Sequence, residues 1–131
     1  IGREHLAHAE RSDGQFEADQ PAGQTLSQIA AINPLRADIL GVYLREMRVA
    51  AAAIAVSLAP GGHLVLVMGD NHVCGIPVKT SQLIRGFFEA EGLTLRCELI
   101  DTIKSRGLMT KRNRTAGMIT QEHVFLFRKE K

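Results

Sequence analysis

With 131 residues, 45% of them hydrophobic, the chain is long enough for one domain with a buried core. The formal net charge of +2 excludes binding to nucleic acid through overall charge alone. The sequence has no apolar run long enough to span a membrane and no signal peptide, so we expect a cytoplasmic protein without membrane contact. The two cysteines, Cys74 and Cys97, lack the spacing of a metal site and are typical of reduced thiols.

Residues 1–32 are weakly patterned, and we expect an irregular amino-terminal segment with one short helix. His5 and His8 are spaced by one helical turn, but no third ligand lies nearby, so we predict no metal site. Because the first residue is Ile1 rather than Met, we expect a fragment or a trimmed chain.

Residues 33–131 form the second expected unit, which opens with a long helix. Asn33 is a good helix cap, and Pro34 suits the first helical position. Apolar residues then recur every three or four positions as far as Leu58, which predicts one continuous helix. The small side chains of residues 50–53 would let another backbone approach this helix closely.

A tight turn and a strand follow the helix. Pro60 cannot extend the helix, and two glycines after it allow the chain to reverse. The continuous apolar run of residues 64–68 predicts a strand covered on both faces, as in the parallel sheets of α/β proteins. Ligands bind at the carboxyl ends of such strands, so Asp70 and Asn71 are candidate substrate-pocket residues. A simple turn would explain these two residues equally well.

The next elements are a connecting loop over residues 72–79, a helix capped by Thr80 or Ser81, and a strand that starts after the helix-ending Gly92. Residues 93–103 alternate between apolar and polar, which predicts a half-exposed strand at a sheet edge. One side of this strand is expected to carry Leu93, Leu95, Cys97 and Leu99.

The last strand, residues 122–128, is apolar on both faces at its centre. We therefore predict that it lies in the sheet interior, antiparallel to and between residues 64–68 and residues 95–103. Such an order leaves the other edge of 64–68 without a partner, and we expect the isolated chain to self-associate through that edge or through the long helix. Residues 1–32 could instead fold back and cover the edge within one chain.

The segment between the last two strands, residues 104–120, is a basic loop. From Lys104 to Lys131 there are eight basic and two acidic residues, which indicates an anionic partner, although a solvated surface explains most charge runs. The candidates for binding nucleic-acid phosphates are Lys104, Arg106, Lys111, Arg112 and Arg114.

The order of these elements resembles the carboxyl-terminal half of the S-adenosylmethionine-dependent methyltransferase fold, in which the final strand is inserted antiparallel between the two strands before it. The resemblance covers approximately residues 33–129. It implies an α/β fold with a partial Rossmann-like sheet.

Later stretches resemble the exocyclic-amino (adenine or cytosine) DNA methyltransferases, which often end their domain with a Glu, an apolar strand and a Lys. The stretches that carry this resemblance are Thr80-Ser81-Gln82-Leu83-Ile84, Glu91-Gly92-Leu93, Asp101-Thr102-Ile103 and Met118 to Lys129. The implied function is methyl transfer from S-adenosylmethionine to a base amino group in DNA, with the base flipped out of the duplex.

Two motifs of that family are missing. Its glycine-rich cofactor turn follows a strand, whereas Gly61 and Gly62 precede one. Its catalytic Asp/Asn-Pro-Pro-Tyr/Phe tetrapeptide has no counterpart, because Asn33-Pro34 is followed by Leu35. We therefore assign no catalytic residue to this chain and expect it to be inactive alone. Both motifs would lie on a missing amino-terminal half upstream of Ile1, or on a separate segment as in permuted relatives.

Two other functions fit the same sequence. The chain could be a non-catalytic α/β binding or assembly module that forms a homodimer, or part of a methyltransferase for a small-molecule or protein acceptor. Neither the target base nor a recognition sequence follows from these residues.

Overall fold

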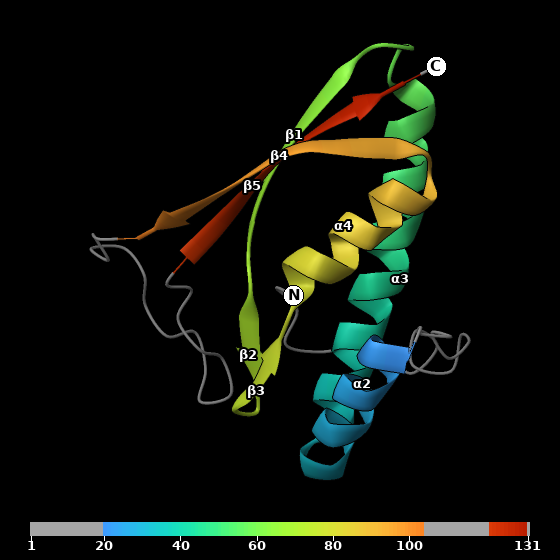
Figure 1. Cartoon of the computed structure of the whole chain (residues 1–131). Coiled ribbons are helices and arrows are strands. Elements are labelled where there is room, and N and C mark those ends of the chain that lie inside the picture. The colour runs from blue at the N-terminus through green and yellow to red at the C-terminus, as the bar shows by residue number, and fades with distance from the viewer. Residues whose placement is uncertain (1–19, 104–120, 131) are drawn as a thin grey trace.

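Three helices and five strands are seen in a computed structural model that describes residues 20–103 and 121–130 (Figure 1). The described elements are α2 (Gln20–Ile32), α3 (Pro34–Ser57), β1 (His63–Gly69), β2 (Asn71–Val73), β3 (Ile76–Val78), α4 (Thr80–Ala90), β4 (Leu93–Thr102) and β5 (Gln121–Lys129). The fold is therefore mixed α/β, as the sequence predicts.

The main sheet has three strands in the order β1-β5-β4, and β5 is antiparallel to both neighbours. This confirms the predicted position of the last strand. Its two central aromatic side chains, Phe125 and Phe127, are fully buried, which explains why this strand takes the interior position.

The prediction that β1 is covered on both faces is wrong for the described part of the chain. Leu64 and Leu66 pack against the core, whereas Val65 and Val67 are 61% and 54% exposed. Among the described residues β1 pairs only with β5, and antiparallel. A continuous apolar run indicates a strand, but it does not show which of its two faces another layer covers.

A β-bulge in β4 also changes the predicted pattern. Leu95 pairs with Phe127, and Cys97 pairs with Leu126, the adjacent residue of β5. The residue between Leu95 and Cys97 is therefore an extra residue in β4. The alternation reverses after the bulge. Leu93 therefore faces the core at 3% exposure, whereas Leu99 lies on the opposite face at 59% exposure. The expectation that both belong to one side is wrong.

The amino-terminal segment contributes to the core. The expected short helix is α2, which packs against α3 and β3. Ala22 and Ile29 on this helix are buried, so residues 20–32 belong to the folded unit rather than to an irregular segment. Residues 1–19, including His5 and His8, lie outside the described residues.

The long helix α3 begins and ends close to its predicted limits. Asn33 is its N-cap, where Oδ1 accepts a hydrogen bond from the Arg36 backbone N–H at 3.3 Å, and Pro34 is its first residue. Near the end of α3, Ala55 is buried. Ile54, one of the apolar residues that recur along this helix, is 38% exposed.

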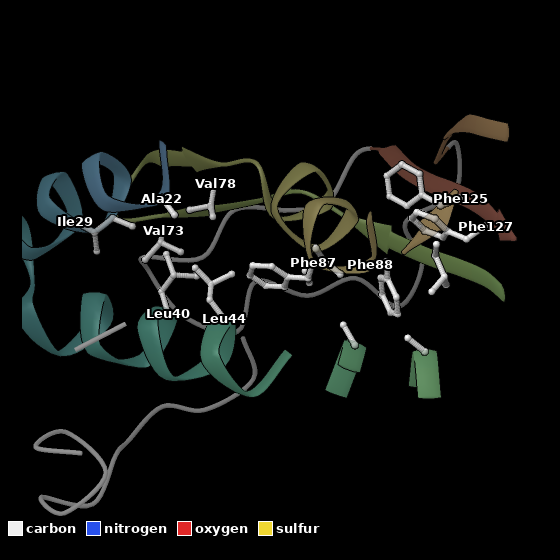
Figure 2. Close-up of a cluster of buried hydrophobic side chains, with 14 of the residues drawn as sticks. Ala22, Ile29, Leu40, Leu44, Val73, Val78, Phe87, Phe88, Phe125 and Phe127 are labelled. Atoms are coloured by element: carbon white, nitrogen blue, oxygen red, sulfur yellow. The ribbon is translucent and has the colours of Figure 1, made fainter. Parts of the chain in front are cut away.

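The core runs the length of α3 and has two ends (Figure 2). Under the sheet, the Phe88 ring lies 5.4 Å from the Phe127 ring, measured between centroids. At the other end, α2 and the short strands β2 and β3 cover α3. The labelled core residues of Figure 2 are Ala22, Ile29, Leu40, Leu44, Val73, Val78, Phe87, Phe88, Phe125 and Phe127.

The expected connecting loop over residues 72–79 is instead a small hairpin. Strands β2 and β3 pair antiparallel, with Val73 opposite Ile76. The two turn residues, Cys74 and Gly75, both have positive φ, at 53° and 76°. This is the backbone conformation that closes a two-residue hairpin.

Lys129 joins the end of the chain to the end of α3. Its Nζ donates hydrogen bonds to the carbonyls of Ala55 and Leu58, at 2.7 and 2.9 Å. Its backbone also pairs with the turn before β1, accepting from Gly61 and donating to Gly62. A cation at the carboxyl end of a helix satisfies carbonyls that lack partners and opposes the negative end of the helix dipole.

We expect Lys129→Met to lower the free energy of unfolding by about 1–3 kcal/mol, because two charge-assisted hydrogen bonds are lost and the aliphatic stem is kept. Urea unfolding followed by far-ultraviolet circular dichroism measures the change. Lys79→Met, at an exposed lysine, is the matched control and should stay within about 0.5 kcal/mol of the wild type. Equal effects of the two substitutions would contradict the capping role.

Candidate functional site at the carboxyl end of β1

The first residue after β1, Asp70, caps helix α4 from a distance. Its Oδ1 accepts hydrogen bonds from the Ser81 backbone N–H at 2.9 Å and from the Ser81 hydroxyl at 2.6 Å. The prediction that Thr80 or Ser81 caps this helix is wrong, because both lie inside α4; the N-cap residue is Lys79, which makes no side-chain capping bond. The Asp70 carboxylate therefore takes over that role and lies at the positive end of the α4 dipole.

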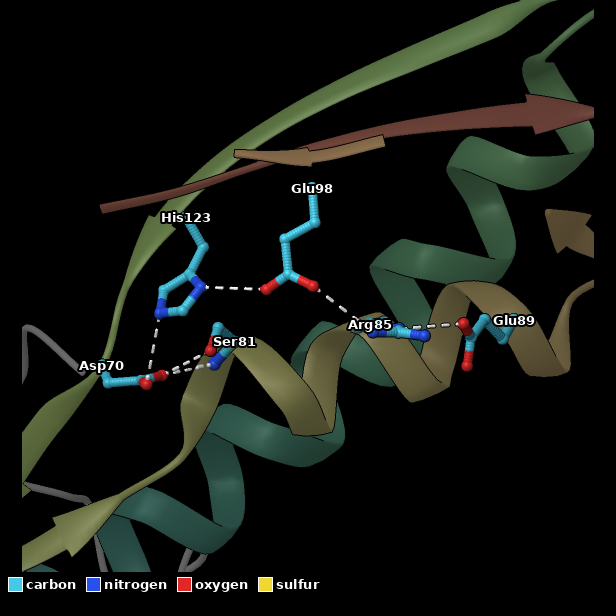
Figure 3. A network of polar contacts seen from close by, with 6 residues as sticks. All are labelled: Asp70, Ser81, Arg85, Glu89, Glu98 and His123. Atoms are coloured by element: carbon cyan, nitrogen blue, oxygen red, sulfur yellow. Dashed lines mark hydrogen bonds and ion pairs between the residues drawn. The ribbon is translucent and has the colours of Figure 1, made fainter. Parts of the chain in front are cut away.

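His123 of β5 lies between two carboxylates (Figure 3). Its Nε2 is 3.5 Å from Asp70 Oδ2, and its Nδ1 is 3.1 Å from Glu98 Oε1. The ring stacks against Phe125 with centroids 5.9 Å apart, and 12% of the side chain is exposed. Glu98 faces this histidine because the bulge in β4 has reversed the alternation of that strand.

The polar contacts continue onto the outer side of α4. Glu98 Oε2 lies 3.5 Å from Arg85 Nη1, and Arg85 Nε donates to Glu89 Oε1 at 2.9 Å. The network of Asp70, Ser81, Arg85, Glu89, Glu98 and His123 thus crosses from the end of β1 over β5 and β4 to α4 (Figure 3). It fixes the position of α4 against the polar end of the sheet.

A shallow depression of about 200 Å³ opens beside this network. Its lining comes from the end of β1, the β2–β3 hairpin, the start of α4 and the start of β5. The lining residues are Asp70, Asn71, His72, Pro77, Val78, Lys79, Gln121 and His123. The volume is below the range of about 300–1,000 Å³ that is usual for small-molecule sites. The depression is therefore too small to be a usual small-molecule site by itself, but its residues could form one wall of a larger pocket.

The side chains of this network hold one another in position, and Ser81 is not placed to act as a nucleophile. A serine, a histidine and carboxylates also occur together in hydrolases, but there the hydroxyl must be free to attack. Here the Ser81 side chain is fully buried, and its hydroxyl donates to Asp70. No group of three or more His, Cys, Asp or Glu in the described part of the chain could hold a metal ion.

The predicted pocket residues, Asp70 and Asn71, both line the depression. Ser81 engages Oδ1 of the Asp70 carboxylate, and Oδ2 faces His123, so this side chain positions the start of α4. The predicted phosphate-binding residues Lys104, Arg106, Lys111, Arg112 and Arg114 lie outside the described residues.

Ser81, Glu98 and His123 were missed as members of the site. Ser81 was named from the sequence only as a candidate helix cap, not as a partner of Asp70. The sequence offers no signal for Glu98, because only the bulge places it on the inner face.

A second surface is the sheet face turned away from the helices. Cross-strand register arranges its side chains in four rows, of which the two central rows are apolar. The central rows are Val65, Leu126 and Cys97, then Val67, Val124 and Leu99. One outer row consists of His63, Arg128 and Thr94, and the other of Gly69, Glu122 and Asp101.

In comparisons of the chain with known protein families, curated proteins and solved structures, no significant match was found. Among the described helices, none has the length and apolar character needed to cross a membrane.

We expect Asp70→Ala to lower the free energy of unfolding by about 1–3 kcal/mol, because α4 loses its cap and the buried Ser81 hydroxyl loses its acceptor. Asn71→Ala, on the same depression, is the control and should have little effect on unfolding. In the Asp70→Ala background, a further Ser81→Ala should cost little or restore stability, since it removes the unpaired hydroxyl. Fully additive effects in urea unfolding would contradict the coupling.

Proposed function

We propose that this chain forms the carboxyl-terminal half of an S-adenosylmethionine-dependent methyltransferase domain that acts on an exocyclic amino group of a DNA base. The observation that carries the proposal is the insertion of β5, antiparallel, between β1 and β4. This strand order is the one that the sequence resemblance implies. The helices α3 and α4, which precede β1 and β4, also follow the implied order.

The end of the chain gives further support. The resembling enzymes often close their domain with a Glu, an apolar strand and a Lys. Here Glu122 and Lys129 lie at opposite ends of β5. Lys129 caps α3 and pairs with the turn before β1, which gives the terminal lysine of the pattern a physical role.

Asp70 and Asn71 have different roles in this proposal. Asp70 is a positioning residue, because its carboxylate holds the start of α4. Asn71 lines the same depression, and its amide could bond the edge of a flipped base through one donor and one acceptor. The depression would then be one wall of the substrate pocket.

The described residues that flank the basic segment lie beside this wall. Thr102 at the end of β4 pairs with Gln121 at the start of β5, and Gln121 lines the depression. Lysines and arginines of this segment would bind DNA phosphates without reading the sequence.

The described residues do not fit the cofactor-binding turn of this family. Gly61 and Gly62 precede β1 and belong to the turn that Lys129 pairs with, whereas a cofactor-binding turn follows a strand. The proposal therefore assigns S-adenosylmethionine binding and the catalytic tetrapeptide to polypeptide outside this chain.

A second candidate function is a non-catalytic assembly module. It is favoured by the outer sheet face, where Val65, Val67 and Leu99 are each more than half exposed. Apolar clusters of this kind often mark protein interaction sites.

The first test is methyl transfer from labelled S-adenosylmethionine to mixed-sequence DNA. We expect no transfer by the isolated chain, and transfer by the longer protein read from the coding sequence upstream of Ile1. Nucleoside analysis should place the label on an adenine or cytosine amino group. Transfer by the pure isolated chain would contradict the assignment of the motifs. Label in protein or in a small molecule instead of DNA would contradict the proposal that DNA is the substrate.

The second test concerns the basic segment. In the longer protein, replacing Lys111, Arg112 and Arg114 together by alanine should weaken DNA binding. Plotted as log affinity against log salt concentration, the slope should become shallower by up to about three phosphate contacts. Replacing Arg36, Arg45 and Arg96 by alanine removes the same charge elsewhere and should leave the slope unchanged. Equal slopes for wild type and the first variant would indicate that this segment is a solvated surface without phosphate contacts.

A further inference from the structure

The outer face of the sheet has an apolar centre that the described part of the chain leaves uncovered. Val65 and Val67 on β1 and Leu99 on β4 are 61%, 54% and 59% exposed. Between them on β5 lie Val124 and Leu126, which are partly buried by their neighbours. These side chains and Cys97 form the two central rows, so the apolar patch spans all three strands.

The two ends of this face carry opposite charges. At one end Arg128 lies opposite His63 and Thr94. The other end has Glu122 opposite Gly69 and Asp101. One row is therefore basic, the other is acidic, and the apolar rows lie between them. The Arg128 Nε is buried and has no hydrogen-bond partner among the described residues.

We propose that this face binds the same face of a second copy of the chain, with the strands of the two sheets running in opposite directions. A two-fold axis between the sheets and perpendicular to the strands places the basic row of each copy over the acidic row of the other. The two apolar rows then stack on each other as in a β-sandwich, whose sheets lie about 10 Å apart.

Charge selects this orientation over its alternative. If the strands of the two sheets ran in the same direction, Arg128 would lie over Arg128 of the second copy and Glu122 over Glu122. Facing like charges disfavours a complex, whereas complementary ends set its register. The observed rows are complementary only when the strands are reversed.

The size of the face sets the expected strength. Three strands about 4.8 Å apart and about 24 Å long give a face of roughly 340 Å² in projection. Stable complexes bury about 800 Å² of accessible surface on each partner. The association is therefore expected to be weak and to depend on protein concentration.

This inference does not rest on the methyltransferase proposal, and it makes the second candidate function specific. Its failure would leave the methyl-transfer assay unaffected, because that assay measures a different property of a longer protein. The competing occupant of the same face is another polypeptide segment. The competing mode of self-association is pairing of two β1 edges, since residues 64–68 carry no charge that would block an added strand.

Sedimentation equilibrium of the full 131-residue chain over a wide concentration range tests the proposal. We expect a monomer–dimer equilibrium that weakens as salt is raised, because the rows attract through charge. Arg128→Glu and Glu122→Arg should each raise the dimer Kd by about tenfold or more. The double variant exchanges the two ends, so the rows match again, and its Kd should return close to that of the wild type.

Val67→Lys provides a second, independent variant. Its side chain is already half exposed, so the monomer should fold, which circular dichroism checks. It places a charge in the apolar centre and should abolish the dimer. A wild-type chain that stays monomeric at every concentration would overturn the proposal. A dimer that survives Val67→Lys would also overturn it and would point to pairing of the β1 edges.

Discussion

The pairing of β5 with a neighbour on each side is the interaction on which the rest of this fold depends. In the main sheet β1 and β4 are not neighbours, and each of them pairs with β5. Its inner face supplies Phe125 and Phe127 to the core, and the same face carries His123 toward the polar site. Its last residue, Lys129, holds the end of α3. One strand thus connects the core, the candidate site and the long helix.

The bulge in β4 determines both surfaces to which a function is assigned. If β4 kept all its residues in an unbroken pleat without the bulge, Glu98 would face outward and could not reach His123 or Arg85. Leu99 would face the core instead of the outer sheet face. A single register shift therefore creates the polar network on one side and completes the apolar patch on the other. Bulges often occur where a strand has to redirect a functional side chain.

Much of this architecture could be predicted from local and periodic signals. The Asn33 cap and the turn before β1 depend on residues that are close together in the sequence. The interior position of β5 follows from apolar residues on both of its faces. The structure has all three features. The bulge was not predictable, because counting alternate residues assumes an unbroken pleat. The cap of α4 was missed for a related reason. Asp70 reaches Ser81 across eleven positions, beyond any local capping pattern. Sequence also could not show that Val65 and Val67 face outward.

The last strand in the chain is the central strand of the sheet, and this order has a consequence for biosynthesis. Lys129 contacts a carbonyl 74 positions earlier, so the sheet is closed by long-range contacts that form late. During synthesis β1 and β4 are made before the nine-residue strand that joins them. Until β5 pairs with them, the nascent chain presents two unpaired strands, in the state most prone to aggregation. Loss of β5 would leave the described helices and the β2–β3 hairpin, but no three-stranded sheet.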